Sequence, residues 1–282
     1  LQNFNGDATI ITSIGNASAS VQMSPASGNK EQAYTAKANI DHFDLGKLLK
    51  NPELLGPLTM KADVNGQGLT DTSIQAQLRT TVEEVFLKNY SYKKLTIEGE
   101  INKKSFDGKA SMDDKNIAFN YSGIIDLDSA HPTYDFTFNL LGADLKALQL
   151  SKEDFRVSAF IQSDLKKENT ENMTGTAIIK NAKIIKQEKN FQLDSIVIKS
   201  GYENGIASIS LRSEMMNANL SGDVALQQLP GALKKHLGNY FDLQKKDTLN
   251  TIKPQKFDFE INVTDPTLLT EGIIPELEKL TP

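Results

Sequence analysis

Alternation of apolar and polar side chains with a period of two runs through most of this 282-residue chain. Clear examples are Tyr34–Ile40, Ile117–Leu127 and Tyr134–Leu140. This period is typical of a β-strand with one covered and one wet face, because successive side chains of a strand point to opposite sides. The pattern therefore predicts an all-β protein.

The connections between the alternating segments are short and rich in turn-forming residues. Asn102–Ser105, Asp113–Asn116 and Glu203–Gly205 each join two such segments and read as hairpin turns. Short connections make consecutive strands antiparallel neighbours. We therefore expect an elongated antiparallel meander that adds one strand after another along a single sheet.

Three segments break the alternation and carry helical spacing instead: Asp44–Leu55, with Asp44 as N-cap, Pro230–Leu243 and Pro266–Leu280. Each is expected to be a short helix docked on the end of a sheet, with a membrane-surface or partner helix as the alternative. The predicted organisation is a β segment over residues 1–229, a helical interruption over 230–250, and a further strand and C-terminal helix over 251–282.

The apolar positions of the strands are unusually small. The hydrophobic fraction is 39%, tryptophan is absent, and many apolar-face positions are Ala, Gly or Met. A face of this kind is not suited to filling a tightly packed core. We expect the sheet to curl into a trough lined for an apolar guest, in which each buried acyl methylene contributes about 0.8 kcal/mol. The alternative is a two-sheet sandwich.

Composition excludes several functional classes. The net charge is −5 with acids and bases interspersed, which argues against a nucleic-acid groove. The absence of cysteine removes disulfides, cysteine-ligated zinc and thiol catalysis. No stretch approaches the roughly 20 apolar residues of a membrane-spanning helix. The chain begins at Leu1 without Met or a signal peptide, so we expect a processed piece of a longer protein.

The residues that could carry chemistry are few. Asp126, Asp128, His131 and Asp135 have the composition of a Ca²⁺ site, but a solvated turn is the preferred interpretation. The pair Asp113–Asp114 falls in a hairpin turn, and no phosphate loop, nucleophile elbow or zinc-protease motif is present. His42 is expected to extend the apolar face of its strand, and His236 to lie on a helix surface. The sequence predicts no enzyme, no cofactor and no metal site.

Three stretches carry a more specific signal. Asp44–Leu69 (DLGKLLKNPELLGPLTMKADVNGQGL), Leu87–Leu127 (LKNYSYKKLTIEGEINKKSFDGKASMDDKNIAFNYSGIIDL) and Tyr134–Leu150 (YDFTFNLLGADLKALQL) follow one another in this order. They resemble repeated elements of the TamB-type proteins of the Bacteroidota, which belong to the AsmA-like group. The likeness extends from about Tyr34 to Val263.

The resemblance implies a fold and a role. Proteins of this family are periplasmic bridges anchored in the inner membrane, with a U-shaped β-sheet (a β-taco) around a hydrophobic groove. They are implicated in phospholipid transport and, through an Omp85-class partner, in outer-membrane protein assembly. By this resemblance the chain is an internal segment in the periplasm, its ligand is the acyl chains of phospholipid, and the membranes lie at the ends of the full-length protein.

The expected groove lining is the set of apolar positions in the alternating segments. These are Tyr34, Ala36, Ile40, Leu58, Met60, Val64, Ile74, Leu78, Leu95, Ile97, Ile117, Phe119, Tyr121, Ile125, Tyr134, Phe136, Phe138, Phe155, Val157, Leu220, Val224, Phe257, Phe259 and Ile261. Two alternatives stay open. One is a scaffold whose exposed edge strand pairs with a client protein, and the other is a β-sandwich module that binds carbohydrate or protein.

Overall fold

The structure is a computed structural model that describes residues 3–26, 31–128, 132–167, 172–223, 256–268 and 271. These residues form fifteen strands and one short α-helix. In chain order they are β1 (Phe4–Thr12), β2 (Gly15–Ser24), β3 (Ala33–Asp44), α1 (Leu45–Leu48), β4 (Leu55–Gln67), β5 (Gln75–Leu87), β6 (Tyr90–Asn102), β7 (Ser105–Asp113), β8 (Ile117–Asp126), β9 (Thr133–Asp144), β10 (Phe155–Lys167), β11 (Met173–Lys186), β12 (Lys189–Glu203), β13 (Ile206–Ser213), β14 (Met216–Asp223) and β15 (Lys256–Val263).

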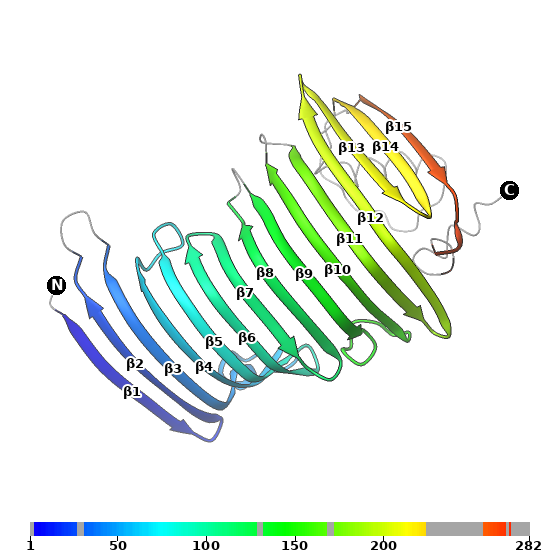
Figure 1. Ribbon diagram of the computed structural model, residues 1–282. Helices are drawn as coiled ribbons and strands as arrows, with labels where there is room; N and C mark the ends of the chain where they lie inside the picture. Colours follow the sequence, from blue (N-terminus) through cyan, green and yellow to red (C-terminus); the bar gives the residue numbers. More distant parts are fainter. Residues whose placement is uncertain are drawn as a thin grey trace. The chain divides into compact units, whose positions relative to one another are not determined.

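Every strand is hydrogen-bonded to its neighbours in the sequence, in the order β1 to β15 (Figure 1). The predicted antiparallel all-β meander is confirmed. Where a two-residue turn joins two strands, as between β6 and β7, it imposes this order, because two residues cannot carry the chain past an adjacent strand. In the turn between β12 and β13, Asn204 and Gly205 have φ values of 52° and 82°, the left-handed backbone that a two-residue hairpin requires.

The sheet is open rather than curled into a trough. Each strand pairs with its predecessor, and among the described residues β1 and β15 have a strand partner on one side only. The expectation of a curled sheet is therefore corrected to an open meander. The two-sheet sandwich is not formed either, because all fifteen described strands belong to one ladder.

The chain divides into two compact units. Unit 1 comprises residues 1–128, 136–161 and 181–192, and it contains β1 to β8 complete. Unit 2 comprises residues 129–135, 162–180 and 193–282, and it contains β13 to β15 complete. The predicted boundaries near residues 230 and 250 fall in the segment 224–255, which lies outside the described residues, so they stay predictions.

An arrangement of six consecutive strands with similar lengths and turn positions occurs twice in the chain. The strands β3 to β8 are followed roughly 100 residues later by β9 to β14, which have similar lengths and turn positions. β3 and β9 both end in an aspartate, Asp44 or Asp144, and a connection of equal length leads from each to the next strand. The tandem plan shows in the sequence as Asp44, Leu45 and Leu48 against Asp144, Leu145 and Leu148.

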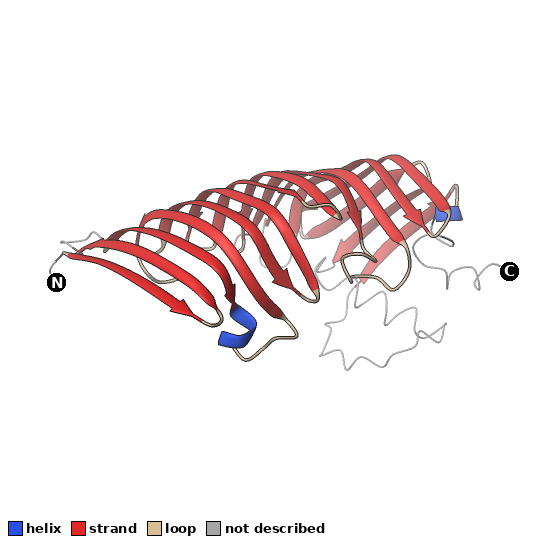
Figure 2. Ribbon diagram, turned by 90° about the horizontal axis from the view of Figure 1, so that it is seen from below, coloured by secondary structure: helices blue, strands red, loops and turns tan. Residues whose placement is uncertain are grey.

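α1 confirms the helical turn predicted at Asp44–Leu55 (blue at the ends of β3 and β4, Figure 2). The Asp44 carboxylate accepts a hydrogen bond from the backbone N–H of Lys47 at 2.9 Å. This bond satisfies one of the N–H groups that a helix start leaves unpaired. The segment Pro230–Leu243 and most of Pro266–Leu280 lie outside the described residues. No helix among the described residues is long and apolar enough to cross a membrane.

A β-bulge interrupts β3 at His42. The register with β4 shifts between Ile40 and Phe43, and His42 takes a positive φ of 49°. The extra residue sends Phe43 rather than His42 to the covered side, and Phe43 is buried. The expectation that His42 extends the apolar face is wrong, because its side chain is 72% exposed and contacts Asp41 instead.

Candidate functional site

The cross-strand register of unit 1 places its apolar residues on one side of the sheet. Four rows cross β2 to β8 on this side, and we call them together the apolar face of unit 1. The rows are Ala17–Ile40–Met60–Val82–Leu95–Met112–Phe119, Ala19–Ala38–Ala62–Thr80–Ile97–Ala110–Tyr121, Val21–Ala36–Val64–Leu78–Gly99–Gly108–Gly123 and Met23–Tyr34–Gly66–Ala76–Ile101–Phe106–Ile125. The alternation in the sequence thus becomes a continuous apolar surface.

Most of the predicted lining residues of unit 1 belong to this face. Those that lie in the four rows are Tyr34, Ala36, Ile40, Met60, Val64, Leu78, Leu95, Ile97, Phe119, Tyr121 and Ile125. Leu58 continues the face beyond the bulge, paired with Phe43 and Val85. Ile74 does not lie in a strand but precedes β5, half-buried. The structure brings these residues together, whereas their role in binding stays a prediction.

Aromatic rings gather on the apolar face at β7, β8 and β9. Phe106 stacks on Tyr121 with ring centroids 6.2 Å apart, and Tyr121 lies 5.7 Å from Phe136. Phe119 lies 5.3 Å from Phe138. Phe136 and Phe138 therefore join the predicted lining. Ring pairs at these separations add about 0.5–1.5 kcal/mol each beyond the area that they bury.

Phe106 was missing from the predicted lining, and glycines explain its position. A Cβ on Gly99 or Gly108 would lie 2.8 or 2.7 Å from carbons of the Phe106 ring, so only glycine leaves room for it. Alternation alone could have assigned Phe106 and Met112 to the face. The glycine row beneath the ring depends on cross-strand register, which the sequence does not state.

The hydroxyl of Tyr121 is buried within the aromatic cluster and has no hydrogen-bond partner among the described residues. Burial raises the pKa of this phenol, and the charge of Asp107 raises it further. The aromatic cluster is thus an apolar surface with one unpaired hydroxyl group inside it.

One end of the apolar face is covered by the chain itself. Leu148, in the connection between β9 and β10, is 1% exposed and forms a cluster with Tyr90 and Ala143. Ile117 and Val157, two predicted lining residues, pack against this cluster, so they are part of a small core. Phe155 starts β10 beside them, and its carbonyl accepts from the Leu145 N–H at 2.8 Å.

A polar network adjoins the Leu148 cluster through Tyr90, which belongs to both. The Tyr90 hydroxyl donates to the carboxylate of buried Asp114, which also accepts from the backbone N–H groups of Lys93 at 3.2 Å and Asn116 at 2.8 Å. Burial, together with the hydrogen bond to Asp114, raises the pKa of Tyr90 to about 12. These hydrogen bonds stabilise the turn between β7 and β8. The pairing of these two strands confirms the hairpin predicted at Asp113–Asn116.

Unit 2 has an apolar face of its own in β13, β14 and β15. The register pairs Leu220 with Phe259 and Ala218 with Ile261, so the predicted lining residues Leu220, Phe259 and Ile261 share one side. Leu220 is buried together with Ala207, with Phe257 packed against them, whereas Phe259 is 53% exposed. Tyr134 alternates with Phe136 in β9 and is half-buried. Val224 lies outside the described residues.

The opposite side of unit 1 carries an alternating charge ladder. Lys37, Asp63, Arg79, Glu98 and Lys109 lie directly opposite one another across five consecutive strands. Lys37 contacts Asp63 at 3.6 Å, and Arg79 donates to Glu98 at 2.5 Å. The hydrogen bond lowers the pKa of Glu98 and raises that of Arg79. Cross-strand pairs of opposite charge favour this register over its alternatives.

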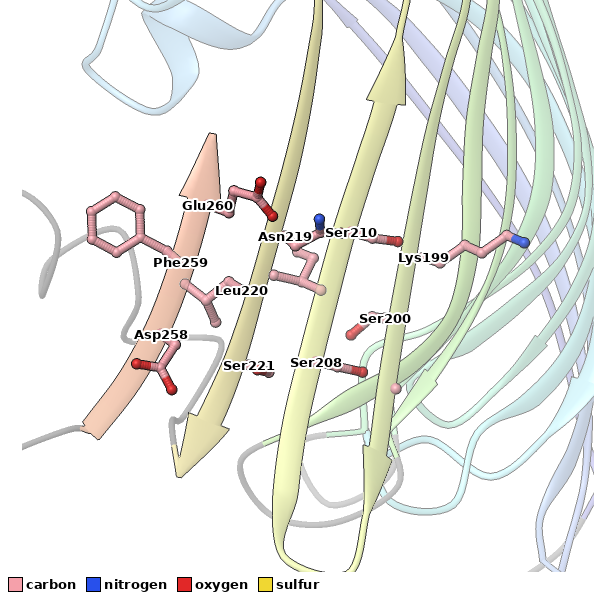
Figure 3. A pocket seen from close by; sticks show the side chains of 12 residues that line it. Lys199, Ser200, Ser208, Ser210, Asn219, Leu220, Ser221, Asp258, Phe259 and Glu260 are labelled. Carbon is pink, nitrogen blue, oxygen red and sulfur yellow. The ribbon is translucent and has the colours of Figure 1, made fainter. Parts of the chain in front are cut away.

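The hollows described in the structure overlap the predicted lining only in part. A hollow of about 560 Å³ in unit 2 lies over β12 to β15 (Figure 3). Two polar rows border it, Lys199–Ser210–Asn219–Glu260 and Ser208–Ser221–Asp258. Another hollow, in unit 1, is lined by the charge ladder from Lys37 to Glu98. Predicted lining residues also border both hollows, Leu220 and Phe259 in unit 2 and Ala36, Val64 and Leu78 in unit 1. Polar rows and apolar positions therefore border these hollows together.

The acidic residues considered as candidate metal or catalytic groups make local contacts at the ends of strands. Asp126 accepts from the backbone N–H of Asp128 at 2.8 Å, and Asp113 contacts exposed Lys94 at 3.2 Å. Among the described residues no group of three potential metal ligands occurs. His131 and His236 lie outside the described residues.

No protein-family model, no curated protein and no solved structure matches this chain.

Proposed function

We propose that the apolar face of unit 1 binds the acyl chains of phospholipids, and that the chain is a segment of a periplasmic bridge that carries lipid between two membranes. The observation behind this proposal is the set of four apolar rows across seven strands, which no second sheet of the described residues covers. The bridge, its location and an Omp85-class partner come from the resemblance to TamB-type proteins.

The chemistry of the face suits an acyl chain. Small alanine side chains between larger ones leave shallow spaces for a flexible hydrocarbon, and aromatic rings, among them Phe106 packed over Gly99 and Gly108, add contact area. Each methylene that leaves water contributes about 0.8 kcal/mol, so a chain of sixteen carbons in part contact is bound without any polar anchor. The head group stays in water beyond the face. A lipid that moves along such a surface does not need to bind one position more tightly than the others. No covalent bond changes during this movement, so no catalytic residue is required.

A photo-crosslinking residue in place of Phe119 tests the proposal. Phe119 lies on the apolar face, and its neighbour Asn120 pairs with Ser111 on the opposite face, so the same probe at Asn120 is the matched control. Irradiation after purification from a membrane-containing host should attach phospholipid at Phe119 and not at Asn120, detected by mass spectrometry of the intact chain. Equal labelling at both positions, or none at either, would contradict the proposal.

Charge substitution gives an independent test. Ala110→Glu places a carboxylate in the middle of the apolar face, whereas Ser111→Glu places it on the opposite side of the same strand. Desolvating a carboxylate against an acyl chain is costly. We expect Ala110→Glu to reduce co-purified lipid roughly tenfold, an effect of about 1.4 kcal/mol, and Ser111→Glu to leave it unchanged. Circular dichroism of both variants checks that the sheet is intact.

A further inference from the structure

We propose that the Tyr121 hydroxyl donates a hydrogen bond to the ester carbonyl of a bound glycerolipid, so that the apolar face of unit 1 prefers lipids with ester-linked acyl chains. The inference rests on the proposed function, because it assigns a group of the ligand to one atom of the same face. It adds a polar contact to a surface whose apolar rows alone would not distinguish an ester linkage from an ether linkage.

The Tyr121 hydroxyl is an exception to the usual pairing of buried polar groups. Its oxygen is buried, yet it has no hydrogen-bond partner among the described residues. The large majority of buried polar atoms in folded proteins are paired, and an unpaired one lowers the stability of the protein. A buried donor without an acceptor in the lipid-free chain is therefore available to an acceptor that a ligand supplies.

The fold itself does not require a hydroxyl at this position. The last strands of the two six-strand arrangements, β8 and β14, contain the same Asn-x-Ser-Gly sequence at Asn120–Gly123 and Asn219–Gly222. Leu220 stands in the second sequence where Tyr121 stands in the first. Leu220 is buried, with Phe257 packed against it. An apolar side chain thus fills the equivalent position, so the hydroxyl has a role other than packing.

The rings beside Tyr121 can uncover its hydroxyl without a change of the backbone. Phe106 of β7 and Phe136 of β9 have ring centroids 6.2 Å and 5.7 Å from that of Tyr121, and both side chains are half-buried. No second sheet of the described residues covers them. Rotamer changes of side chains at a surface are fast and leave the pairing of the strands intact. We therefore expect a lipid that settles on these rings to reach the hydroxyl.

An ester carbonyl suits this hydroxyl better than a head-group phosphate does. Tyr121 lies in a row with Ala110 and Ile97, whereas the basic residues of the charge ladder lie on the opposite side of the sheet. A phosphate at Tyr121 would lose its water without gaining a cation. The ester carbonyl is an uncharged acceptor, and it belongs to the acyl chain itself. The glycerol and the head group then leave the face toward water at this point.

Two short-chain phosphatidylcholines, one ester-linked and one ether-linked with chains of equal length, test the inference in competition with a fluorescent phospholipid below their micelle concentrations. The wild-type chain should bind the ester-linked lipid about fivefold more tightly, which corresponds to about 1 kcal/mol for one hydrogen bond. Tyr121→Phe should bind both lipids equally, with the affinity of the wild type for the ether-linked lipid. Tyr34→Phe is the matched control, because it removes the hydroxyl of another half-buried tyrosine on the same face and should keep the preference.

The stability of the lipid-free chain gives a second measurement. Tyr121→Phe removes a buried donor that has no acceptor, so the urea concentration at the midpoint of unfolding should rise. A lower midpoint would show that the hydroxyl is already paired within the chain and would overturn the inference. Equal affinity of the wild type for the two lipids would also overturn it, while leaving the binding of acyl chains to the face intact. Binding of neither lipid would overturn the proposed function as well.

Discussion

Two connections in the molecule start from the same local motif and end in different surroundings. The first leads from β3 to β4 and contains α1, and the second leads from β9 to β10. In each, an aspartate carboxylate accepts the N–H of the third residue that follows, at 2.9 Å from Lys47 to Asp44 and 2.9 Å from Ala147 to Asp144. The turn ends in each case at a residue with positive φ, Lys50 or Gln149.

Their leucines differ in burial. Leu148 of the second connection is 1% exposed, whereas Leu48 and Leu49 of the first are 54% and 60% exposed. The second connection lies against Tyr90, Ile117 and Val157, which supply the apolar surface that buries Leu148. Capping therefore determines the course of the turn, and the neighbouring strands determine whether the turn becomes part of a core.

The largest expected effect tests the packing difference. Leu148→Ala removes a fully buried side chain and should lower the free energy of unfolding by about 2–5 kcal/mol. Leu48→Ala at the matching position of the first connection should change it by less than about 0.5 kcal/mol, as surface substitutions do. Urea unfolding followed by circular dichroism measures both. Equal losses would show that the two turns are equivalent after all.

The second effect concerns the polar network that lies beside the second connection. Asp114→Ala leaves the Tyr90 hydroxyl and two backbone N–H groups without their acceptor and should lower the free energy of unfolding by about 1–3 kcal/mol. The adjacent Asp113→Ala serves as control, because the Asp113 side chain is exposed. A loss at Asp113 as large as at Asp114 would contradict the assigned role.

The third prediction uses pH. The pKa of Tyr90 is raised to about 12 in the folded protein, whereas an unfolded tyrosine titrates near pH 10. Between these values the unfolded chain loses its proton first, so stability falls as the pH rises from about 10 to 12. Tyr90→Phe should flatten this part of the stability profile, measured by urea unfolding at each pH. An unchanged slope in the variant would place the titrating group elsewhere.

The smallest effect tests what the two connections share. Asp44→Ala and Asp144→Ala each remove one capping hydrogen bond of the same length, so the losses of stability should be equal within error. The corresponding Asn variants keep a capping oxygen and should recover most of each loss. A clearly larger loss at Asp144 would mean that the cap and the Leu148 cluster are coupled.

Much of the fold could be predicted because its determinants are local. The alternation in Tyr34–Ile40 and the turn at Asn204–Gly205 depend on neighbours in the sequence, and both predictions are confirmed. The cap at Asp44 was predicted for the same reason. The tandem arrangement of six strands was not predicted, because the alternation of one strand resembles that of any other.

The features that could not be predicted depend on register. Nothing local marks Lys37, Asp63 and Arg79 as members of one ladder, because residues between them belong to separate strands and turns. The position of Phe106 over Gly99 requires the pairing of β6 with β7. Alternation in the sequence predicts that the His42 side chain lies on the apolar face, but the bulge in β3 moves it off this face. The alternation within a strand predicts which residues share a face of the sheet. Which residues of different strands form a row across that face depends on how the strands pair.

The strand order has a consequence for how the protein folds. Each strand pairs only with its neighbours in the sequence, so most of the loops closed during folding are short and their entropy cost is small. Such a ladder can nucleate at any hairpin and grow outward, as linear repeat proteins do. We expect folding to be fast for a sheet of this size. Removing or inserting one hairpin would then change the length of the sheet without abolishing its cooperativity.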